Sequence, residues 1–385
     1  MTTRIYALPV QETGWQVPSG STTAFDWDYD QGRDRLLGLY DRGKKRQWDA
    51  AERIDWSHQV DLDNPLLAPE ETVPIYGSRT WASLGERERG QVRHHMIAWQ
   101  FSQFLHGEQG ALICASKIVQ TVPGLDAKFY AATQVMDEAR HVEAYSRYLR
   151  DKLDLAYPIN PHLKALLNDV IADARWDMTY LGMQVLIEGL ALAAFGLIRD
   201  VAVDPLAKAI NAYVMQDEAR HVAFGRLALR EYYQQLSDRE RSEREEFCVE
   251  ACHLMRDRFL GEEIWRTLGF DADGCIRYVR ESETLRQFRS LLFSRIVPTL
   301  RDIGMFGPRV RAAFAGMGVL GFEQLDVEAL MADDEAVAES IDAQRRRQVA
   351  DTVDAGRAEG SGRGGSGDPE GVPRWEGPQG GAPEA

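Results

Sequence analysis

The pentapeptide Asp-Glu-Ala-Arg-His occurs twice in the sequence, at residues 137–141 and, eighty residues later, at 217–221. Its Glu and His are three residues apart, so on a helix both side chains share one face and can bind one metal ion. A further Glu stands on an apolar stretch thirty residues before the Glu of each copy. The pattern therefore offers six metal ligands in two equivalent sets: Glu108, Glu138, His141, Glu188, Glu218 and His221.

Four carboxylates gathered in one protein core would repel one another and lose their hydration. Two divalent cations would neutralise these four negative charges, with both histidines binding as neutral imidazoles. Oxygen ligands with one nitrogen for each ion suit iron(II) or manganese(II), whereas structural zinc sites prefer closed tetrahedra of cysteine and histidine. The sequence therefore predicts two iron ions, with manganese as the alternative, in a centre that changes oxidation state and reacts with dioxygen.

The other residues of the pentapeptide suit the support of such ligands. A metal-bound imidazole needs its second ring nitrogen held, usually by a carboxylate. Asp137 and Asp217 are the candidates, and we expect each to hold the histidine of the opposite repeat. Arg140 and Arg220 could then pair with these aspartates. The alternative, that these are ordinary surface ion pairs, loses weight because the whole pattern occurs twice.

One aromatic residue and several apolar ones lie within a helical turn or two of the predicted ligands. Tyr145 follows His141 by four residues, and its counterpart in the second repeat is Gly225. The tyrosine could carry a radical generated by the metal ions, hydrogen-bond a ligand, or simply pack. The apolar residues would either line a substrate pocket over the metal ions or belong to the core: Phe104, Leu112, Leu192, Phe195 and Phe224.

Long helices must position these residues. Residues 101–153 and 181–233 align without a gap, which indicates the internal duplication of an α-hairpin. Two such hairpins predict an all-α fold, a four-helix bundle with the metal site in its core. Apolar periodicity, with breaks at Pro- and Gly-containing segments, predicts four helices at about 83–122, 126–153, 162–203 and 206–236.

The rest of the chain divides around this bundle. We expect residues 1–80 to form an N-terminal arm with a helix at 33–52, packed on the bundle of residues 81–236. Additional helices should fill residues 237–354, and the Gly- and Pro-rich residues 355–385 should be disordered. Beyond a helix that begins at Ser237, the helices expected in the additional region lie at about 279–294, 295–316 and 335–353.

Composition excludes several classes of partner. The formal net charge is −15 without a basic stripe, which argues against nucleic acid and anionic membrane surfaces. Four cysteines without paired spacing and no signal peptide predict a reducing cytoplasm. The apolar run Leu181–Ile198 approaches the length of a membrane span, but it carries Gln184 and Glu188 and belongs to the repeat. We therefore expect it to be a buried helix.

The six ligand positions resemble those of the ferritin-like di-iron carboxylate superfamily. The doubled Asp-Glu-Ala-Arg-His is similar to the hydroxylases of multicomponent monooxygenases, to acyl-carrier-protein desaturases and to amine N-oxygenases. The segment from His141 to Ser146, which includes Tyr145, resembles the radical-bearing small subunit of ribonucleotide reductase. The resemblance implies a ferritin-like bundle, an iron pair that activates dioxygen, and a homodimer.

Three positions depart from individual members of that superfamily. Glu108 stands where the reductase subunit commonly carries Asp, as it does in oxygenases. Leu192 replaces the Thr of the hydroxylases, which argues against their type of proton gate. Val214 stands where the N-oxygenases carry an additional His ligand, so we expect only a distant relation to them.

These observations lead to a di-iron oxidase or oxygenase that oxidises a small, mostly apolar organic substrate. The electrons should come from a separate reductase or ferredoxin, because the sequence has neither a GxGxxG dinucleotide motif nor an iron–sulfur cysteine set. One alternative is a radical-generating subunit that depends on Tyr145. The other is a non-enzymatic ferritin-like iron-binding protein, which the extra C-terminal helices disfavour.

Overall fold

The computed structural model describes residues 7, 20–24 and 33–334, together with some of the residues from 336 to 347. The chain divides into two compact units, Met1–Glu339 and Ser340–Ala385, and the description concerns the first. The described residues contain helices and loops but no β-strand, which confirms the all-α prediction. Most of the expected N-terminal arm, much of the helix expected at 335–353 and the tail expected to be disordered lie outside the described residues.

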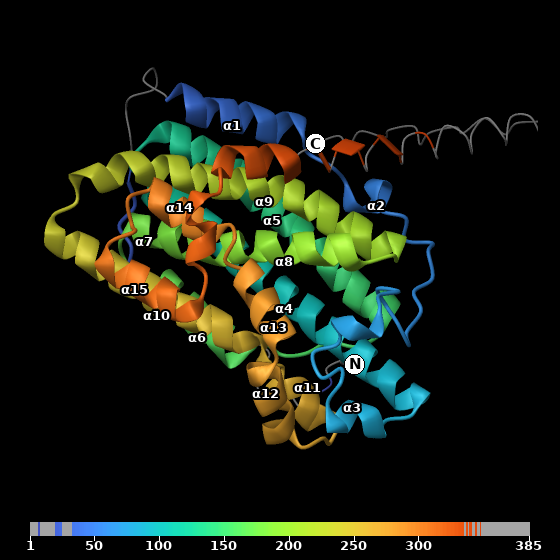
Figure 1. Ribbon diagram of the computed structural model, residues 1–385. Helices are drawn as coiled ribbons and strands as arrows, with labels where there is room; N and C mark the ends of the chain where they lie inside the picture. Colours follow the sequence, from blue (N-terminus) through green and yellow to red (C-terminus); the bar gives the residue numbers. More distant parts are fainter. Residues whose placement is uncertain are drawn as a thin grey trace, which may run out of the picture. The chain divides into compact units, whose positions relative to one another are not determined.

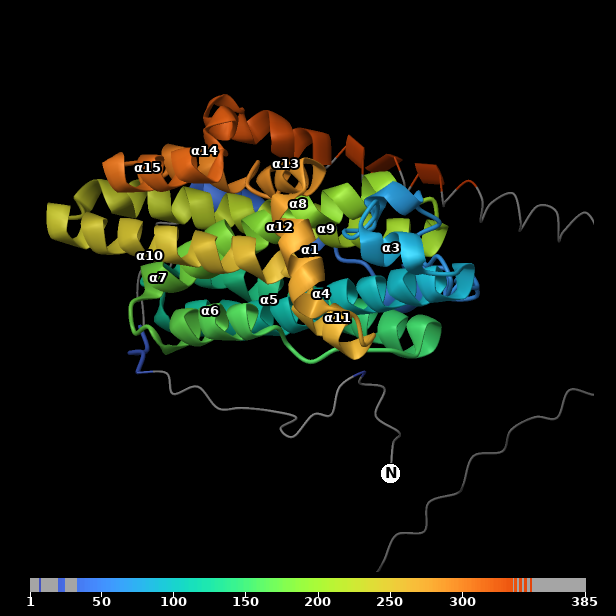
Figure 2. The ribbon, with the colours of Figure 1, turned by 60° about the horizontal axis from the view of Figure 1, so that its bottom comes forward.

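Two antiparallel hairpins form the bundle. Figure 2 shows α4 and α5 in one layer and α8 and α9 in the next. Helix α8 continues without a break from α7 through the π-helical segment η3, so these three segments act as one bundle helix. The predicted ferritin-like four-helix bundle is confirmed, with these bounds: α4 Glu86–Thr121, α5 Leu125–Tyr148, α7 Trp176–Tyr180, η3 Leu181–Ile187, α8 Glu188–Val201 and α9 Pro205–Tyr232.

Polar side chains at the helix starts explain several of these bounds. The side chain of Asp204 accepts a hydrogen bond from the backbone N–H of Ala207, and Pro205 occupies the first helical position of α9. Asn160 caps α6 (Pro161–Ala172) in the same way. Ser237 and Glu240 form a capping box at the start of α10 (Asp238–Asp257), where the sequence also predicts a helix start.

The helix predicted from 162 to 203 is wrong as a single element, because the chain breaks between α6 and α7. The ammonium group of Lys117, on α4, donates 2.7 Å to the carbonyl oxygen of Ile171 and also bonds the carbonyl oxygen of Asp173. The carboxylate of Asp173 then accepts from the backbone N–H of Arg175 at 2.8 Å. These contacts satisfy the carbonyls that end α6 and turn the chain into the bundle helix.

Further helices cover the bundle. Helix α1 (Asp34–Lys45) lies over α5 and α9, and a short α2 (Ala50–Arg53) follows it, so the single helix predicted at 33–52 is interrupted (Figure 1). Helix α10 packs against η3 and α6, and its Arg244 forms a buried ion pair, 3.0 Å, with Asp177 of α7.

The remaining helices are shorter than the two predicted at 279–294 and 295–316. Ser282 caps a new helix inside the first range, and Gly304, at φ 78°, interrupts the second. Smaller segments of the described part are η1 Glu70–Thr72, α3 Arg79–Ser83, η2 Leu149–Leu153, η4 Tyr233–Gln235, η5 Arg258–Leu260 and η6 Leu320–Gln324. The C-terminal helices are α11 Glu262–Thr267, α12 Ala272–Glu281, α13 Glu283–Leu291, α14 Ile296–Asp302 and α15 Pro308–Met317.

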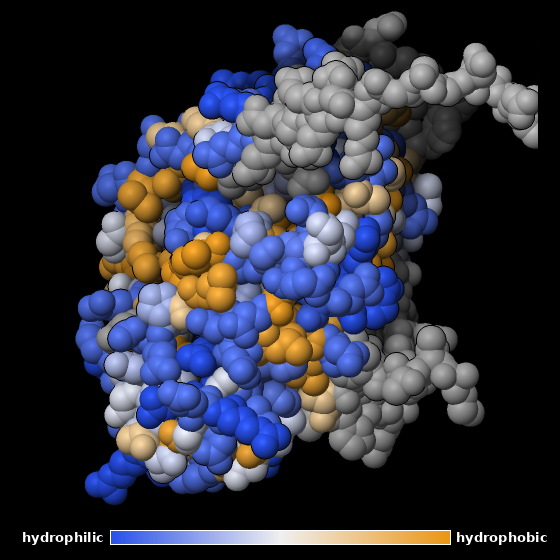
Figure 3. Space-filling view, turned by 90° about the vertical axis from the view of Figure 1, so that its right-hand side faces the viewer, coloured by the Kyte–Doolittle hydropathy of each residue, from blue (hydrophilic) through white to orange (hydrophobic). Residues whose placement is uncertain are grey.

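The most apolar stretch of the chain lies inside the bundle. Among the described residues, the helix from Trp176 to Val201 is long and apolar enough to cross a membrane, but 83% of its most apolar window is buried inside the protein. On the face that Figure 3 shows, hydrophobic side chains form separate patches between hydrophilic ones. The burial of this helix agrees with the prediction of a buried core helix.

Candidate metal centre

The six predicted metal ligands converge in the centre of the bundle, and each is at most 5% exposed. One comes from α4 and one from the first position of α8, where the π-helical segment η3 ends. The other four come in Glu-His pairs from α5 and α9, one turn apart on the inward face. A π-helical segment changes the facing of the residues that follow it and is frequent at functional sites. The converging residues are Glu108, Glu138, His141, Glu188, Glu218 and His221.

These residues form two groups of four in which the candidate ligand atoms all lie within 4.8 Å of one another. One group holds Glu108 and His141, the other Glu188 and His221, and both include Glu138 and Glu218. Two ions held here would share these two carboxylates, and each would have one further carboxylate and one imidazole within reach.

The donor atoms of the site fit a pair of cations. Oε2 of Glu188 is buried without a hydrogen-bond partner among the described residues. The two carboxylate oxygens of Glu218 lie 3.1 and 3.4 Å from Nδ1 of His141 and of His221 but form no hydrogen bond of good geometry there. Buried polar atoms almost always have a partner, because an orphaned one costs about 1–3 kcal/mol. Carboxylate oxygens left unsatisfied together in one buried place indicate ligands that bind metal ions.

Electrostatics point the same way. Burial and the nearby Glu218 carboxylate raise the pKa of both Glu108 and Glu188 well above its usual value. Burial alone would lower the pKa of His141, but the neighbouring Asp217 and glutamate carboxylates outweigh burial and raise this pKa well above its usual value. Without cations the site thus tends to retain protons, and two divalent ions would replace them.

Each histidine contacts the aspartate of the opposite repeat. Nε2 of His141 lies 3.1 Å from Oδ2 of Asp217, and Nε2 of His221 lies 3.3 Å from Oδ2 of Asp137. The Nδ1 atoms face the glutamates instead: Nδ1 of His141 is 3.1 Å from Oε1 of Glu218. The aspartates thus orient both rings with Nδ1 toward the carboxylate cluster.

The two arginines of the pentapeptides bind these aspartates. Nη2 of Arg140 donates to Oδ2 of Asp217 at 2.8 Å and also bonds Asp137. Arg220 bonds Oδ1 of Asp217 and lies 3.8 Å from Asp137. Burial alone would raise the pKa of Asp217, but Arg220, His141 and Arg140 outweigh it and hold the pKa well below its usual value. The aspartate therefore remains ionised.

Sequence reasoning missed three polar partners of the site. Trp48 donates from Nε1 to Oδ2 of Asp217 at 2.8 Å, and Gln47 donates from Nε2 to Oδ1 of Asp137 at 2.7 Å. Both lie between α1 and α2, and no pattern in the sequence singles them out. Gln134 donates to Glu138 at 3.1 Å and to Glu188 at 3.0 Å. Its place one turn before Glu138 was a signal that could have been used.

The aromatic and apolar candidates separate into two places. Tyr145 packs with Phe104 and Phe195 at centroid distances of 5.7 and 5.8 Å, and Phe104 meets Phe195 at 4.6 Å. The Tyr145 hydroxyl donates to Oδ1 of Asn211 at 3.3 Å, and burial together with Glu108 and Glu218 raises its pKa well above its usual value.

The remaining apolar candidates are Phe224, Leu192 and Leu112. Phe224 packs with Tyr130 and Tyr180, at 4.3 and 5.0 Å, on the side where Tyr130 contacts His221. Leu192 is buried, whereas Leu112 is only half-buried. The structure therefore does not gather the five apolar candidates into one pocket.

An apolar pocket of about 290 Å³ lies farther along α4 and α8. Trp99 of α4 lines it nine residues before Glu108, and Ile198 of α8 lines it ten residues after Glu188. Phe104 and Phe195 stand at intermediate positions on the same two helices. Neither of the two rings is among the residues that line the pocket.

A ferritin-like bundle whose core holds two Glu/His groups with shared carboxylates defines the class of non-haem di-iron proteins. The model of the p-aminobenzoate N-oxygenase AurF family matches residues 30–304, and the chain belongs to this family. The protein is accordingly a di-iron oxygenase or oxidase. The resemblance to amine N-oxygenases is confirmed by this match.

The chain was also compared with curated protein sequences and with solved structures. No curated protein sequence matches the chain. Solved structures similar to it include a valine-to-isoleucine mutant of an R2-like ligand-binding oxidase with an anaerobically reconstituted Mn/Fe cofactor. The two sequences are 18% identical, the match covers 73% of this chain and 96% of the oxidase chain, and the TM-score is 0.43. A valine-to-leucine mutant of that oxidase follows at 19% identity, 74% and 94% coverage and a TM-score of 0.38.

Proposed function

We propose that this protein is a monooxygenase that uses its di-iron centre to oxidise the nitrogen of a small, mostly apolar amine. The family supports the reaction type, since its model describes a p-aminobenzoate N-oxygenase. The observation that carries the proposal is the pair of buried ligand groups that share Glu138 and Glu218. The iron pair, when bound, supplies the activation of dioxygen.

The residues around the metal ions have distinct roles in this proposal. Glu108 and His141 would complete the ligands of one ion, and Glu188 and His221 those of the other. The amide of Gln134, which donates to both Glu138 and Glu188, keeps these carboxylates in place while the centre changes oxidation state. Asp217 and Asp137 keep Nδ1 of each imidazole turned toward the ions.

The substrate would reach the centre through the apolar pocket between α4 and α8. Its walls include Trp99, Ile198 and Trp265, which suit an aromatic or aliphatic molecule. In this proposal the Phe104 and Phe195 rings, which pack together with Tyr145 beside them, would form the barrier between pocket and centre. These apolar side chains would exclude bulk water from the reacting atoms.

The proposal includes an electron donor and a cellular setting. We infer a separate reductase or ferredoxin, because the sequence contains no flavin, nicotinamide or iron–sulfur motif. The four cysteines are buried and unpaired, which supports a cytoplasmic location. A homodimer is also proposed: Phe129 and Met136 lie two turns apart on α5 and are 41% and 61% exposed, an apolar strip that a second copy would cover.

Reconstitution tests the proposal. The protein is loaded anaerobically with iron(II), reduced chemically, and mixed with dioxygen and p-aminobenzoate or aniline. We expect two irons per chain and mass-spectrometric detection of N-hydroxylated or nitro products, with the label from ¹⁸O₂ incorporated. A matched variant, Glu138→Ala, should lose both iron and product. A protein that binds only zinc, or that consumes dioxygen without oxidising any amine, would contradict the proposal.

A further inference from the structure

A second pocket lies on the other side of the ligand-supporting aspartates. It measures about 570 Å³ and is enclosed by α1, by α9 and by residues 328–332. Arg220 lines it and also bonds Asp217, so this one side chain separates the pocket from the metal centre. The pocket is thus distinct from the apolar pocket between α4 and α8, and the proposed reaction does not use it.

Four arginines and two carboxylates, Asp34 and Glu328, line this pocket. Arg226 is neutralised by Asp302, at 3.0 Å, and by Glu328. Within the part of the chain that the structure describes, the guanidinium groups of Arg35 and Arg42 make neither a hydrogen bond nor an ion pair, and both side chains are exposed. Two free guanidinium groups facing one cavity repel each other, and in a protein of net charge −15 such a cavity attracts anions.

Two buried arginines add unused donors. Nε of Arg220 and Nε of Arg226 are buried without a hydrogen-bond partner among the described residues, and the two side chains are 5% and 4% exposed. A buried N–H of a charged group that lacks an acceptor is costly. Both side chains line the pocket, so its wall contains guanidinium groups with donors that the described residues leave unused.

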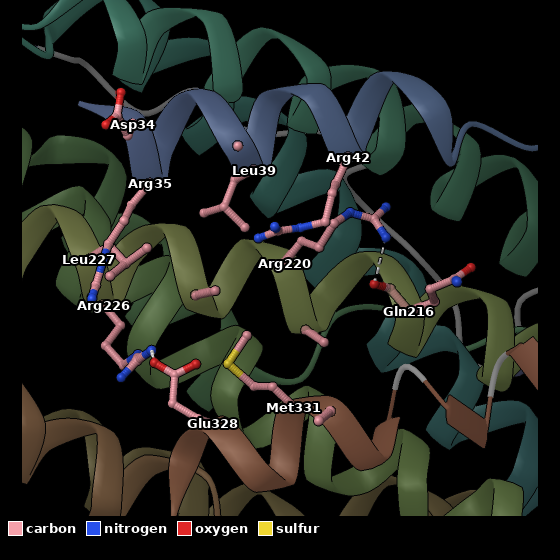
Figure 4. Close-up of a pocket in the computed structure, with 14 residues that line it drawn as sticks. Asp34, Arg35, Leu39, Arg42, Gln216, Arg220, Arg226, Leu227, Glu328 and Met331 are labelled. Carbon is pink, nitrogen blue, oxygen red and sulfur yellow. Dashed lines mark hydrogen bonds and ion pairs between the residues drawn. The ribbon is translucent and has the colours of Figure 1, made fainter. Parts of the chain in front are cut away.

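The spacing of the free arginines indicates the form of the anion. Arg35 and Arg42 are seven residues apart on one face of α1, a separation of about 10 Å along the helix axis. Leu39 stands between them on that face, and Leu227 and Met331 face it across the pocket. Figure 4 shows both arginines extending from α1 toward α9, with Leu39 between them.

We propose that this pocket binds a small organic dianion, in which two carboxylate or phosphate groups are separated by an apolar segment. One anionic group lies at Arg35, the other lies at Arg42 and Arg220, and the apolar segment packs on Leu39, Leu227 and Met331. Bidentate arginine–carboxylate or arginine–phosphate contacts hold both ends.

Calorimetric titration of the iron-loaded full chain tests the proposal, with α,ω-dicarboxylates from succinate to sebacate as probes. We expect Kd to reach a minimum at one chain length, at least about tenfold below that of the monocarboxylate of equal length. The variants Arg35→Ala and Arg42→Ala should each raise that Kd about tenfold, while iron content and melting temperature stay unchanged.

Lys44→Ala is the matched control, because it removes one positive charge of α1 outside the pocket, where Lys44 already pairs with Asp41. It should leave Kd unchanged. The proposal is overturned if no dicarboxylate binds at millimolar concentration, if monocarboxylates bind equally well, or if Lys44→Ala weakens binding as much as Arg35→Ala. It is equally overturned if only an acidic protein, and no small dianion, binds through these arginines.

Discussion

Nε2 of His141 lies 3.1 Å from Oδ2 of Asp217, although the two residues belong to different repeats. The same oxygen accepts hydrogen bonds from Nε1 of Trp48 and Nη2 of Arg140, both at 2.8 Å. Three donors around one buried oxygen fix the carboxylate, which in turn fixes the imidazole ring. The orientation of a proposed metal ligand therefore depends on a residue from the opposite hairpin and on one from the segment that joins α1 to α2.

Replacement of Asp217 should lower the affinity of the centre for iron. Asp217→Asn removes the negative charge and presents an amide N–H₂ to donors that need an acceptor. Since partners of metal-bound histidines contribute about 10–100-fold to metal affinity, we expect a loss of that size in iron(II) affinity. Competition with a chromogenic chelator measures it. Asp302→Asn, which affects only the partner of Arg226 and Arg230, is the control and should retain wild-type affinity.

Tyr145 separates the oxygenase from the radical-generating alternative. Its hydroxyl makes one hydrogen bond, to Asn211, and its ring packs with Phe104 and Phe195. Loss of a single neutral hydrogen bond costs about 1 kcal/mol, so Tyr145→Phe should retain turnover within roughly fivefold. Electron paramagnetic resonance after exposure to dioxygen provides the second readout. A tyrosyl radical in the wild type that disappears in Tyr145→Phe together with all activity would support the alternative instead.

Gly225, the counterpart of Tyr145 in the second repeat, allows α9 to approach η3 closely. A Cβ atom at this position would lie 2.5 Å from Cβ of Gln184. Overpacking of this kind costs about 1–3 kcal/mol, so Gly225→Ala should lower the melting temperature. In Gly316→Ala, on α15, a Cβ would meet nothing within 4 Å, and the loss of helix-interior glycine should raise the melting temperature slightly. Equal melting temperatures for the two variants would show that η3 shifts to accommodate the methyl group.

The sequence predicted the parts of the site that helix geometry determines. The i, i+3 spacing of Glu138 and His141 fixes a common face within one helix, and the duplication extends this relation to the second hairpin. Gln47 and Trp48 could not be predicted, because their contacts with the site aspartates join residues 90 and 169 positions apart. The break between α6 and α7 depends on Lys117 of another helix and leaves no local signal either.

A larger side chain in the wall of the apolar pocket between α4 and α8 should obstruct the proposed route of the substrate. Leu197 lines the apolar pocket between α4 and α8 and is only partly buried, so Leu197→Trp should narrow the pocket without disturbing the metal ligands. We expect KM for the amine to rise roughly tenfold while kcat at saturation and iron content change little. Val203→Trp is the matched control, since Val203 is 67% exposed and does not line the pocket. An unchanged KM in Leu197→Trp would place the entrance elsewhere.

His95 should make the stability of the fold depend on pH. Its Nδ1 lies 2.7 Å from the hydroxyl of buried Tyr157, and burial, together with the neighbouring His94, lowers the pKa of His95 to about 4. The unfolded chain takes up a proton near pH 6.5 and the folded chain only near pH 4, so the unfolded state binds more protons between these values. The stability due to neutral His95 is therefore full above about pH 6.5 and is lost as the pH falls toward 4. Because the ring is only partly buried, we expect about 1 kcal/mol, measured as the fall in unfolding free energy from pH 7 to pH 5. His95→Gln should reduce this fall, whereas an equal fall in both proteins would show that other groups cause it.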